Sequence, residues 1–167
     1  MPVPEPRLRK SVRAIVLDQT SRVLLCRFDL SSRGLIVWAP PGGGVEPGET
    51  PFEALRRELD EEIGLALETE PPLVWHERIV EPSFAEEYDG IVNDYYLVEA
   101  EAFVPQGSLD AEALRHENVT GFRWWTLGEL QSYRGEAVFG PRDLAVRLAD
   151  LLQAAPPNRT SVVDADS

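Results

Sequence analysis

The sequence predicts a single α/β domain, and three observations lead to this fold class. Short apolar runs bounded by turn residues fill the first 40 positions, which is typical of strands. A helix with clear start and stop signals follows, and further strand-like runs come after it. The chain then ends in two short helical patterns. A length of 167 residues with 43% hydrophobic residues suits one domain with its own core.

The N-terminal part is expected to form three strands. After a proline-rich lead over 1–9, two apolar runs at 10–17 and 22–28 are separated by turn residues, which predicts a hairpin. A third strand is expected over 35–39. It ends at Pro40-Pro41 because proline cannot donate a hydrogen bond to a sheet ladder.

The central helix is expected to run over 51–63. Thr50 is a suitable N-cap, and Pro51 fits the first helical position. Glu53 stands three residues after Thr50 and completes a capping box. Gly64 is the expected C-cap, because glycine readily adopts the left-handed conformation that ends a helix.

The second half of the chain predicts three more strands and two helices. Strands are expected over 73–80, 93–104 and 121–126, and helices near 127–133 and 141–154. The last of these helices marks the expected end of the domain.

The domain is therefore expected to span 10–154, followed by a tail over 155–167. The tail lacks the apolar residues that would hold it against a core, so disorder is expected there. Cys26 is the only cysteine, which excludes a disulfide within the chain, and the N-terminus carries no apolar signal-like stretch. These features indicate a cytoplasmic protein.

The net charge of -13 restricts the partners of the protein. Nucleic acid and anionic membrane surfaces would be repelled over most of the molecule, so neither is an expected partner. A small anionic substrate can still bind where a metal ion intervenes.

Three glutamates crowd one strip of the central helix, namely Glu58, Glu61 and Glu62. Spacings of three and four residues bring such side chains together on a helix. The adjacent face is apolar and is expected to pack on the sheet; it carries Phe52, Leu55, Leu59 and Ile63. Close carboxylates are driven toward protonation unless cations neutralise them, so the acidic strip indicates a metal site.

The segment around this helix resembles the Nudix box of the MutT-like hydrolases. The matching pattern reads Gly43-x5-Glu49-x7-Arg57-Glu58-Leu59-x-Glu61-Glu62-x-Gly64-Leu65. The order of predicted strands and helices around it also resembles the Nudix fold, an α/β/α sandwich around a mixed β-sheet. The resemblance implies a pyrophosphohydrolase that cleaves a phosphoanhydride bond in a nucleoside diphosphate linked to another moiety.

The resemblance also implies a metal site for Mg²⁺ or Mn²⁺. Glu58 and Glu62 would be the main ligands, Glu61 would share that role, and Gly43 would add its backbone carbonyl. Glu49 and Arg57 would hold one another and orient the loop and helix.

The general base that activates water is left open among three glutamates. Glu58 and Glu61 are the candidates within the box, and Glu117 is the candidate in the loop before the last strand. Arg27 and Trp38, which both precede the box in the sequence, are candidates for binding substrate. Arg27 can reach a phosphate, and Trp38 can stack on a base.

The resemblance leaves the substrate open, since it places specificity in the loops after the box, expected over 76–93 and 106–120. Two other functions are alternatives. A non-catalytic nucleotide-sensing Nudix domain usually loses box glutamates, which this chain keeps, and isopentenyl diphosphate isomerase needs a catalytic cysteine motif that does not surround Cys26. Family members are often dimers, so a homodimer is possible.

Overall fold

In the computed structural model, which describes residues 2, 4–85, 87–154 and 163–164, nine strands form one mixed sheet. Their order across the sheet is β8-β3-β2-β1-β6-β5-β9, while β4 pairs with β1 and β7 pairs with β2. The pairs β1 with β6, β3 with β8, and β5 with β9 are parallel, and the others are antiparallel. The strands are β1 Leu8–Leu17, β2 Val23–Leu30, β3 Leu35–Ala39, β4 Gly42–Gly44, β5 Leu73–Ala85, β6 Tyr88–Glu99, β7 Val119–Trp125, β8 Val138–Phe139 and β9 Val163–Asp164.

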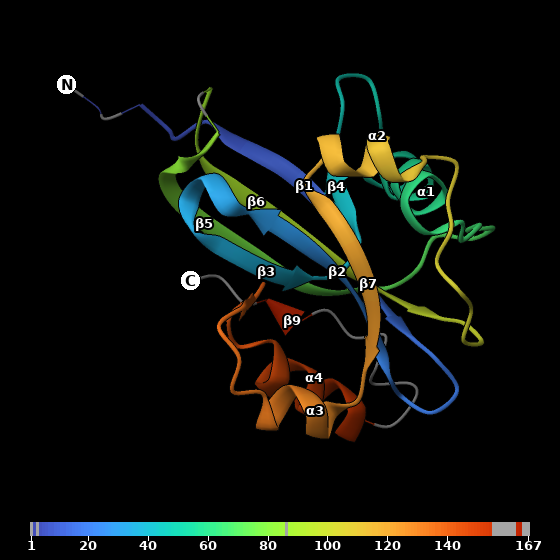
Figure 1. Cartoon of the computed structure of the whole chain (residues 1–167). Helices are drawn as coiled ribbons and strands as arrows, with labels where there is room; N and C mark the ends of the chain where they lie inside the picture. Colours follow the sequence, from blue (N-terminus) through green and yellow to red (C-terminus); the bar gives the residue numbers. More distant parts are fainter. Residues whose placement is uncertain (1, 3, 86, 155–162, 165–167) are drawn as a thin grey trace.

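Helices lie on both sides of this sheet (Figure 1). One cluster of buried residues joins α1 to the sheet, and a second joins α3 and α4 to the opposite face. The arrangement is the expected α/β/α sandwich around a mixed sheet. The helices are α1 Pro51–Ile63, α2 Ala111–His116, α3 Leu127–Ser132 and α4 Leu144–Gln153, with a 3₁₀ turn, η1, at Ser31–Arg33.

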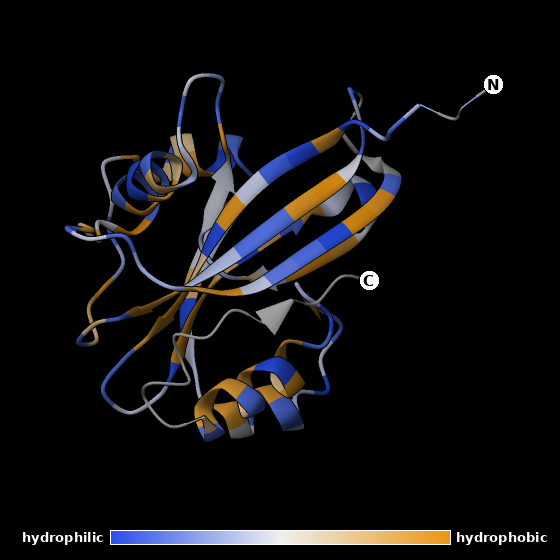
Figure 2. Cartoon of the chain, turned by 180° about the vertical axis from the view of Figure 1, so that it is seen from behind, coloured by the Kyte–Doolittle hydropathy of each residue, from blue (hydrophilic) through white to orange (hydrophobic). Residues whose placement is uncertain are grey.

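Alternation along β1 explains how one strand serves both clusters. Val12 and Val16 point toward α1, whereas Ile15 and Leu17 point toward α3 and α4, because successive side chains of a strand face opposite sides. Figure 2 shows hydrophobic and hydrophilic residues interspersed along the long strands. β1 therefore stands at the centre of the fold.

Two predicted elements occur with the expected bounds. The helix over 51–63 and the strand over 35–39 are confirmed residue for residue. The first strand begins at Leu8, inside the segment that was assigned to the N-terminal lead, because Leu8 and Arg9 pair with β6.

The strand expected over 93–104 was wrong at both ends, since β6 covers Tyr88–Glu99. The strand begins earlier than expected because Gly90 pairs with Leu8 on one side and with Val80 on the other. Its end moves back because β1, its parallel partner, stops opposite Glu99. Residues 76–93, expected to be a loop, are mostly the antiparallel hairpin of β5 and β6.

Four short elements, η1, β4, α2 and β8, have no counterpart in the sequence prediction. The tail over 155–167 lies outside the described residues except for Val163–Asp164, which form β9, so its expected disorder stays a prediction. Among the described residues, no helix is both long and apolar enough to cross a membrane.

Candidate metal and phosphate site

Helix α1 presents its acids from a firmly fixed position. The Thr50 hydroxyl accepts from the Glu53 amide at 3.1 Å, and the Glu53 carboxylate accepts from the Thr50 amide at 3.1 Å, so the predicted capping box is present. Gly64 ends the helix with a φ of 71° in the left-handed region. Both ends of the helix are therefore satisfied by its own local sequence.

The acidic strip lies at the edge of the buried face of α1. Glu58 is 7% exposed and Glu62 is 1% exposed, because both follow the apolar side chains that pack on the sheet. Carboxylates are seldom buried to this degree without a partner. This burial distinguishes them from a solvated acidic face.

A third carboxylate joins these two from a distant part of the chain. Oxygen atoms of Glu58, Glu62 and Glu117 all lie within 4.8 Å of one another, and we call this group the carboxylate cluster. Glu117 caps the C-terminus of α2, directly before β7, and β7 pairs with β2. The pairing of β7 with β2 thus brings the loop glutamate, Glu117, close to Glu58 and Glu62 of α1.

Glu61 does not belong to the carboxylate cluster. Its carboxylate accepts from the Arg57 guanidinium at 3.4 Å instead. Burial and the charge of Glu58 raise its pKa. It lies beside the cluster within electrostatic range.

Electrostatics in the carboxylate cluster favour a bound cation. Burial raises the pKa of Glu62 well above its ordinary value, and Glu58 raises it further, while Arg13 opposes the shift. Burial and the charges of Glu58 and Glu61 raise the pKa of Glu117. No ion pair among the described residues includes Glu62 or Glu117. Because three oxygen donors converge and only Glu58 has an ion-pair partner, Arg57, the donor set fits a hard divalent cation.

Arg57 joins the glycine-rich loop to α1. Its Nε and Nη2 donate to the two carboxylate oxygens of Glu49 at 2.8 and 2.9 Å, and Nη2 also donates to the Gly44 carbonyl at 3.2 Å. The Arg57 hydrogen bonds and the Glu46 amide lower the pKa of Glu49 to about 2. The expected pairing is present, and Arg57 also donates from Nη1 to Glu58 at 2.8 Å.

Gly43 lies directly against Glu58. A Cβ atom at this position would stand 2.5 Å from Glu58 Oε1, so any larger residue would displace the carboxylate from its present position. The Gly43 carbonyl accepts from the Ser11 hydroxyl of β1 at 3.2 Å. The strand and the helix therefore meet at this glycine.

Cys26 contacts Glu62 of the carboxylate cluster, and the sequence did not reveal this contact. Its Sγ lies 3.8 Å from Glu62 Oε2, and both residues are fully buried. Burial raises the pKa of the thiol well above its ordinary value. A cysteine so enclosed is not placed to react with a substrate, which counts against an isomerase that depends on a catalytic cysteine.

Arg27 and Trp38 are register partners on β2 and β3, outside the carboxylate cluster. Arg27 donates to the Thr120 hydroxyl at 2.8 Å. Trp38 packs edge to face against Trp125, with ring centroids 5.3 Å apart. Both side chains have protein partners, and their contact with substrate stays a prediction.

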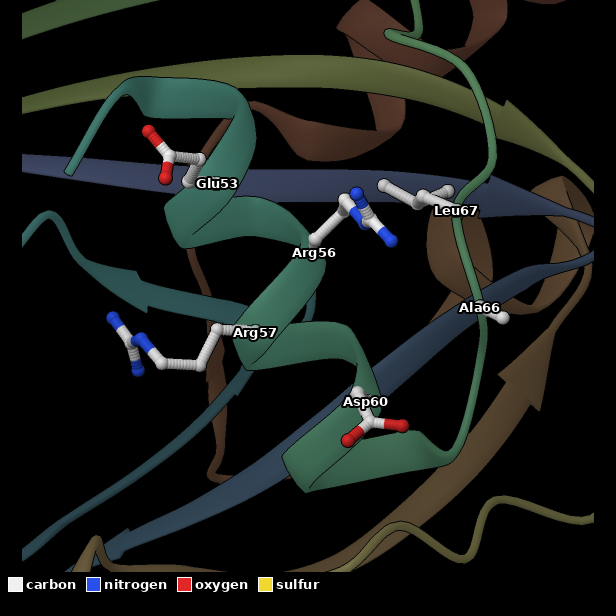
Figure 3. A pocket seen from close by; sticks show the side chains of 6 residues that line it. All are labelled: Glu53, Arg56, Arg57, Asp60, Ala66 and Leu67. Carbon is white, nitrogen blue, oxygen red and sulfur yellow. The ribbon is translucent and has the colours of Figure 1, made fainter.

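A separate hollow of about 380 Å³ lies on the outer side of α1 (Figure 3). Arg56 points across it toward Leu67, while Glu58, Glu62 and Glu117 do not line it. Its lining is formed by Glu53, Arg56, Arg57, Asp60, Ala66 and Leu67. The hollow is therefore distinct from the carboxylate cluster.

Comparison with known proteins identifies the family. The family model described as NUDIX domain matches residues 7–145. The chain belongs to the Nudix family. The family match covers most of the chain and includes the box at 43–65.

Several curated proteins are similar to this Nudix chain. The nucleoside triphosphatase NudI of Enterobacter sp. (strain 638) is 35% identical over 94 residues, covering 54% of this chain and 64% of that protein. The RNA pyrophosphohydrolase of Halorhodospira halophila is 49% identical over 57 residues, 34% of this chain and 29% of that protein. Human 8-oxo-dGDP phosphatase NUDT18 is 43% identical over 77 residues, 43% of this chain and 23% of that protein. The matches thus span less than two thirds of these relatives.

Solved structures share the Nudix fold with this chain. The E. coli ORF135 protein aligns with a TM-score of 0.65 and 23% identity, covering 93% of this chain and 99% of that one. The MutT protein of Methanosarcina mazei Go1 aligns with a TM-score of 0.66 and 20% identity, covering 91% and 100%. At this identity the likeness establishes the fold alone.

Proposed function

We propose that this Nudix protein is a metal-dependent pyrophosphohydrolase. Its substrate would be a nucleoside diphosphate linked to another moiety, cleaved at a phosphoanhydride bond. The observation that carries the proposal is the carboxylate cluster, in which Glu58, Glu62 and Glu117 approach within 4.8 Å. A protein of charge -13 needs cations to hold such an anion, and this cluster is suited to recruit them.

The cation would be Mg²⁺ or Mn²⁺, held by Glu58, Glu62 and Glu117, with Glu61 and the Gly43 carbonyl as further oxygen donors. Mg²⁺ binds carboxylates and substrate phosphates together and keeps part of its water shell. When bound, such a cation supplies compensation for the negative charge that develops on the phosphoryl oxygens.

Glu117 is our first choice for the general base that accepts the proton of the attacking water. It belongs to the carboxylate cluster, and no ion pair among the described residues includes it. Glu58 and Glu61 are the alternatives, although both carboxylates already accept a hydrogen bond from Arg57.

Further parts of the proposal concern binding and location. Arg27 would contact a phosphate and Trp38 a base, after leaving their present partners Thr120 and Trp125. The cytoplasm is the proposed location, with a nucleotide as partner rather than nucleic acid or membrane. A homodimer is compatible with this assignment.

Hydrolysis by the purified full-length chain tests the proposal. A panel of nucleoside triphosphates, dinucleotides and nucleotide sugars is incubated with Mg²⁺, with Mn²⁺ or with EDTA, and phosphate and nucleoside monophosphate are quantified. The expected result is metal-dependent release from at least one compound. The Glu62→Gln variant should be inactive, whereas Asp60→Asn, an exposed acid on the same helix, should match the wild type. Absence of metal-dependent release from every compound would overturn the assignment.

A further inference from the structure

Arg13 of β1 is a half-buried cation that forms no ion pair among the described residues. Its Nη1 donates to the Pro40 carbonyl at 2.9 Å, and its Cζ lies 5.7 Å from the centre of the Phe28 ring. In the described part of the chain, its guanidinium makes no other hydrogen bond. Because a guanidinium carries five N–H donors, most of those on Arg13 are left for water or a ligand.

Three other half-buried arginines have a carboxylate partner. Arg22, Arg57 and Arg147 each donate to a carboxylate at 2.8 Å or less. Arg13 does not, although its charge opposes the rise in the pKa of Glu62 and therefore acts on the carboxylate cluster. Removing a cation from water is costly unless an anion compensates it. Arg13 is therefore suited to an anion that arrives with a ligand.

Arg13 lies next to β4, the strand that meets the carboxylate cluster. It is the register partner of Gly42, and a Cβ atom at Gly42 would stand 2.9 Å from Arg13 Cγ. The following residue, Gly43, lies directly against the Glu58 carboxylate. Arg13 and Glu58 thus approach consecutive residues of one short strand.

Strand β4 presents only backbone to a ligand. Its three residues, Gly42–Gly44, are all glycine, and within the described sheet it pairs with β1 alone. Glycine allows a backbone to approach a ligand closely. A diphosphate held at the carboxylate cluster can extend along the unpaired edge of β4 toward Arg13.

We propose that Arg13 is a further substrate-binding residue, which donates hydrogen bonds to a diphosphate bound at the carboxylate cluster. This inference rests on the proposed function. A guanidinium matches phosphate oxygens well, because its planar fork can donate two parallel hydrogen bonds. The Pro40 carbonyl and the Phe28 ring already hold the side chain, so little conformational freedom is lost on binding.

Binding of methylenediphosphonate tests this contact without turnover, because the P–C–P bridge of this diphosphate analogue is not hydrolysed. In calorimetry with Mg²⁺ present, Arg13→Gln should bind the analogue about 10–100-fold more weakly than the wild type, as expected for a lost charge-assisted hydrogen bond. The affinity for Mn²⁺ alone should not fall, because the substitution removes a positive charge that opposes a second cation.

Arg134→Gln is the matched control. Arg134 also donates from Nη1 to a backbone carbonyl, that of Tyr133 at 3.0 Å, and it forms no ion pair among the described residues. Its substitution removes the same charge and should leave binding of the analogue unchanged. Arg13→Lys keeps the charge without the planar fork and should bind the analogue with intermediate affinity.

Three outcomes would overturn the contact: full affinity for the analogue in Arg13→Gln, the same loss in Arg134→Gln, or an equal loss of Mn²⁺ affinity in Arg13→Gln. The last would mean that Arg13 only positions β4. A measurement on the wild type covers the case in which Arg13→Gln fails to fold. The Arg13 Nε–H resonance, assigned through bonds, should shift when the analogue is added with Mg²⁺, and no shift would overturn the contact.

These measurements separate the contact from the proposed hydrolysis. Binding of the analogue that depends on Arg13, without turnover of any nucleotide, would refute the hydrolase and support the contact. Metal-dependent hydrolysis with full affinity for the analogue in Arg13→Gln would support the hydrolase and overturn the contact.

Discussion

Glu62→Gln should stabilise the metal-free protein while abolishing its response to metal. Glu62 is 1% exposed and forms no ion pair among the described residues, and a buried ion without a paired counter-ion costs several kcal/mol. Because Glu62 can relieve part of this cost by holding a proton, we expect a gain of about 2 kcal/mol in the free energy of unfolding at neutral pH. For a chain of this length, that gain corresponds to a Tm increase of about 4–8 °C.

The pH dependence of this difference has a definite sign. Burial and Glu58 raise the pKa of Glu62, so the folded chain binds its proton more tightly than the unfolded chain. The associated stabilisation is complete below the unfolded pKa and is lost as the pH rises through the folded pKa. The gap between Glu62→Gln and the wild type should therefore shrink as the pH falls from about 8 to about 5. Glu49, whose pKa is lowered to about 2, keeps its charge across this range.

Thermal unfolding in EDTA and in Mg²⁺ measures both effects. Mg²⁺ should raise the Tm of the wild type but not of Glu62→Gln, because a ligand stabilises only the state that binds it. Asp60→Asn, on the exposed side of the same helix, should follow the wild type in both buffers. A metal-free Glu62→Gln protein that melts at or below the wild-type Tm at neutral pH would refute the reasoning.

Three further substitutions test the surroundings of the carboxylate cluster. Gly43→Ala places a Cβ 2.5 Å from Glu58 Oε1 and should weaken Mn²⁺ binding, measured by electron paramagnetic resonance, by about 10-fold or more. Arg57→Lys cannot span both oxygens of Glu49 and should lower kcat/KM by about 10-fold or more in a steady-state assay. Cys26→Ala removes the thiol that lies beside Glu62 and should weaken Mn²⁺ binding by about 10-fold in a calorimetric titration.

Matched variants control these three experiments. Gly121→Ala places its Cβ only in ordinary contact with Arg27, so Mn²⁺ binding should not change. Cys26→Ser keeps a donor at the same site and should recover most of the affinity that Cys26→Ala loses. Unchanged Mn²⁺ affinity in Gly43→Ala or Cys26→Ala, or full activity in Arg57→Lys, would contradict the corresponding contact.

Local signals explain why α1 could be predicted from the sequence with its true bounds. Thr50, Glu53 and Gly64 act within a few residues of the helix ends, so the capping box and the C-cap are written into the segment itself. The same holds for the pairing of Glu49 with Arg57, because the two residues lie only eight positions apart in the sequence.

Tertiary pairing explains what the sequence did not reveal. Residues 88–92 become strand because partners on both sides satisfy them, and α2 has only six residues, too few for a periodic pattern. Glu117 was a candidate from its place before the last strand, but its proximity to Glu58 depends on the pairing of β7 with β2. The contacts of Cys26 with Glu62, and of Glu77 with Asn93, likewise join residues on separate elements.

The pairing of β7 with β2 also couples metal binding to completion of the fold. Two members of the carboxylate cluster lie on α1, but the third arrives only when Val119–Trp125 has added to the sheet. A nascent chain that ends before β7 would hold the acidic helix without its third oxygen donor. Full metal affinity should therefore appear late in synthesis and refolding, which makes the cation a reporter of the finished sheet.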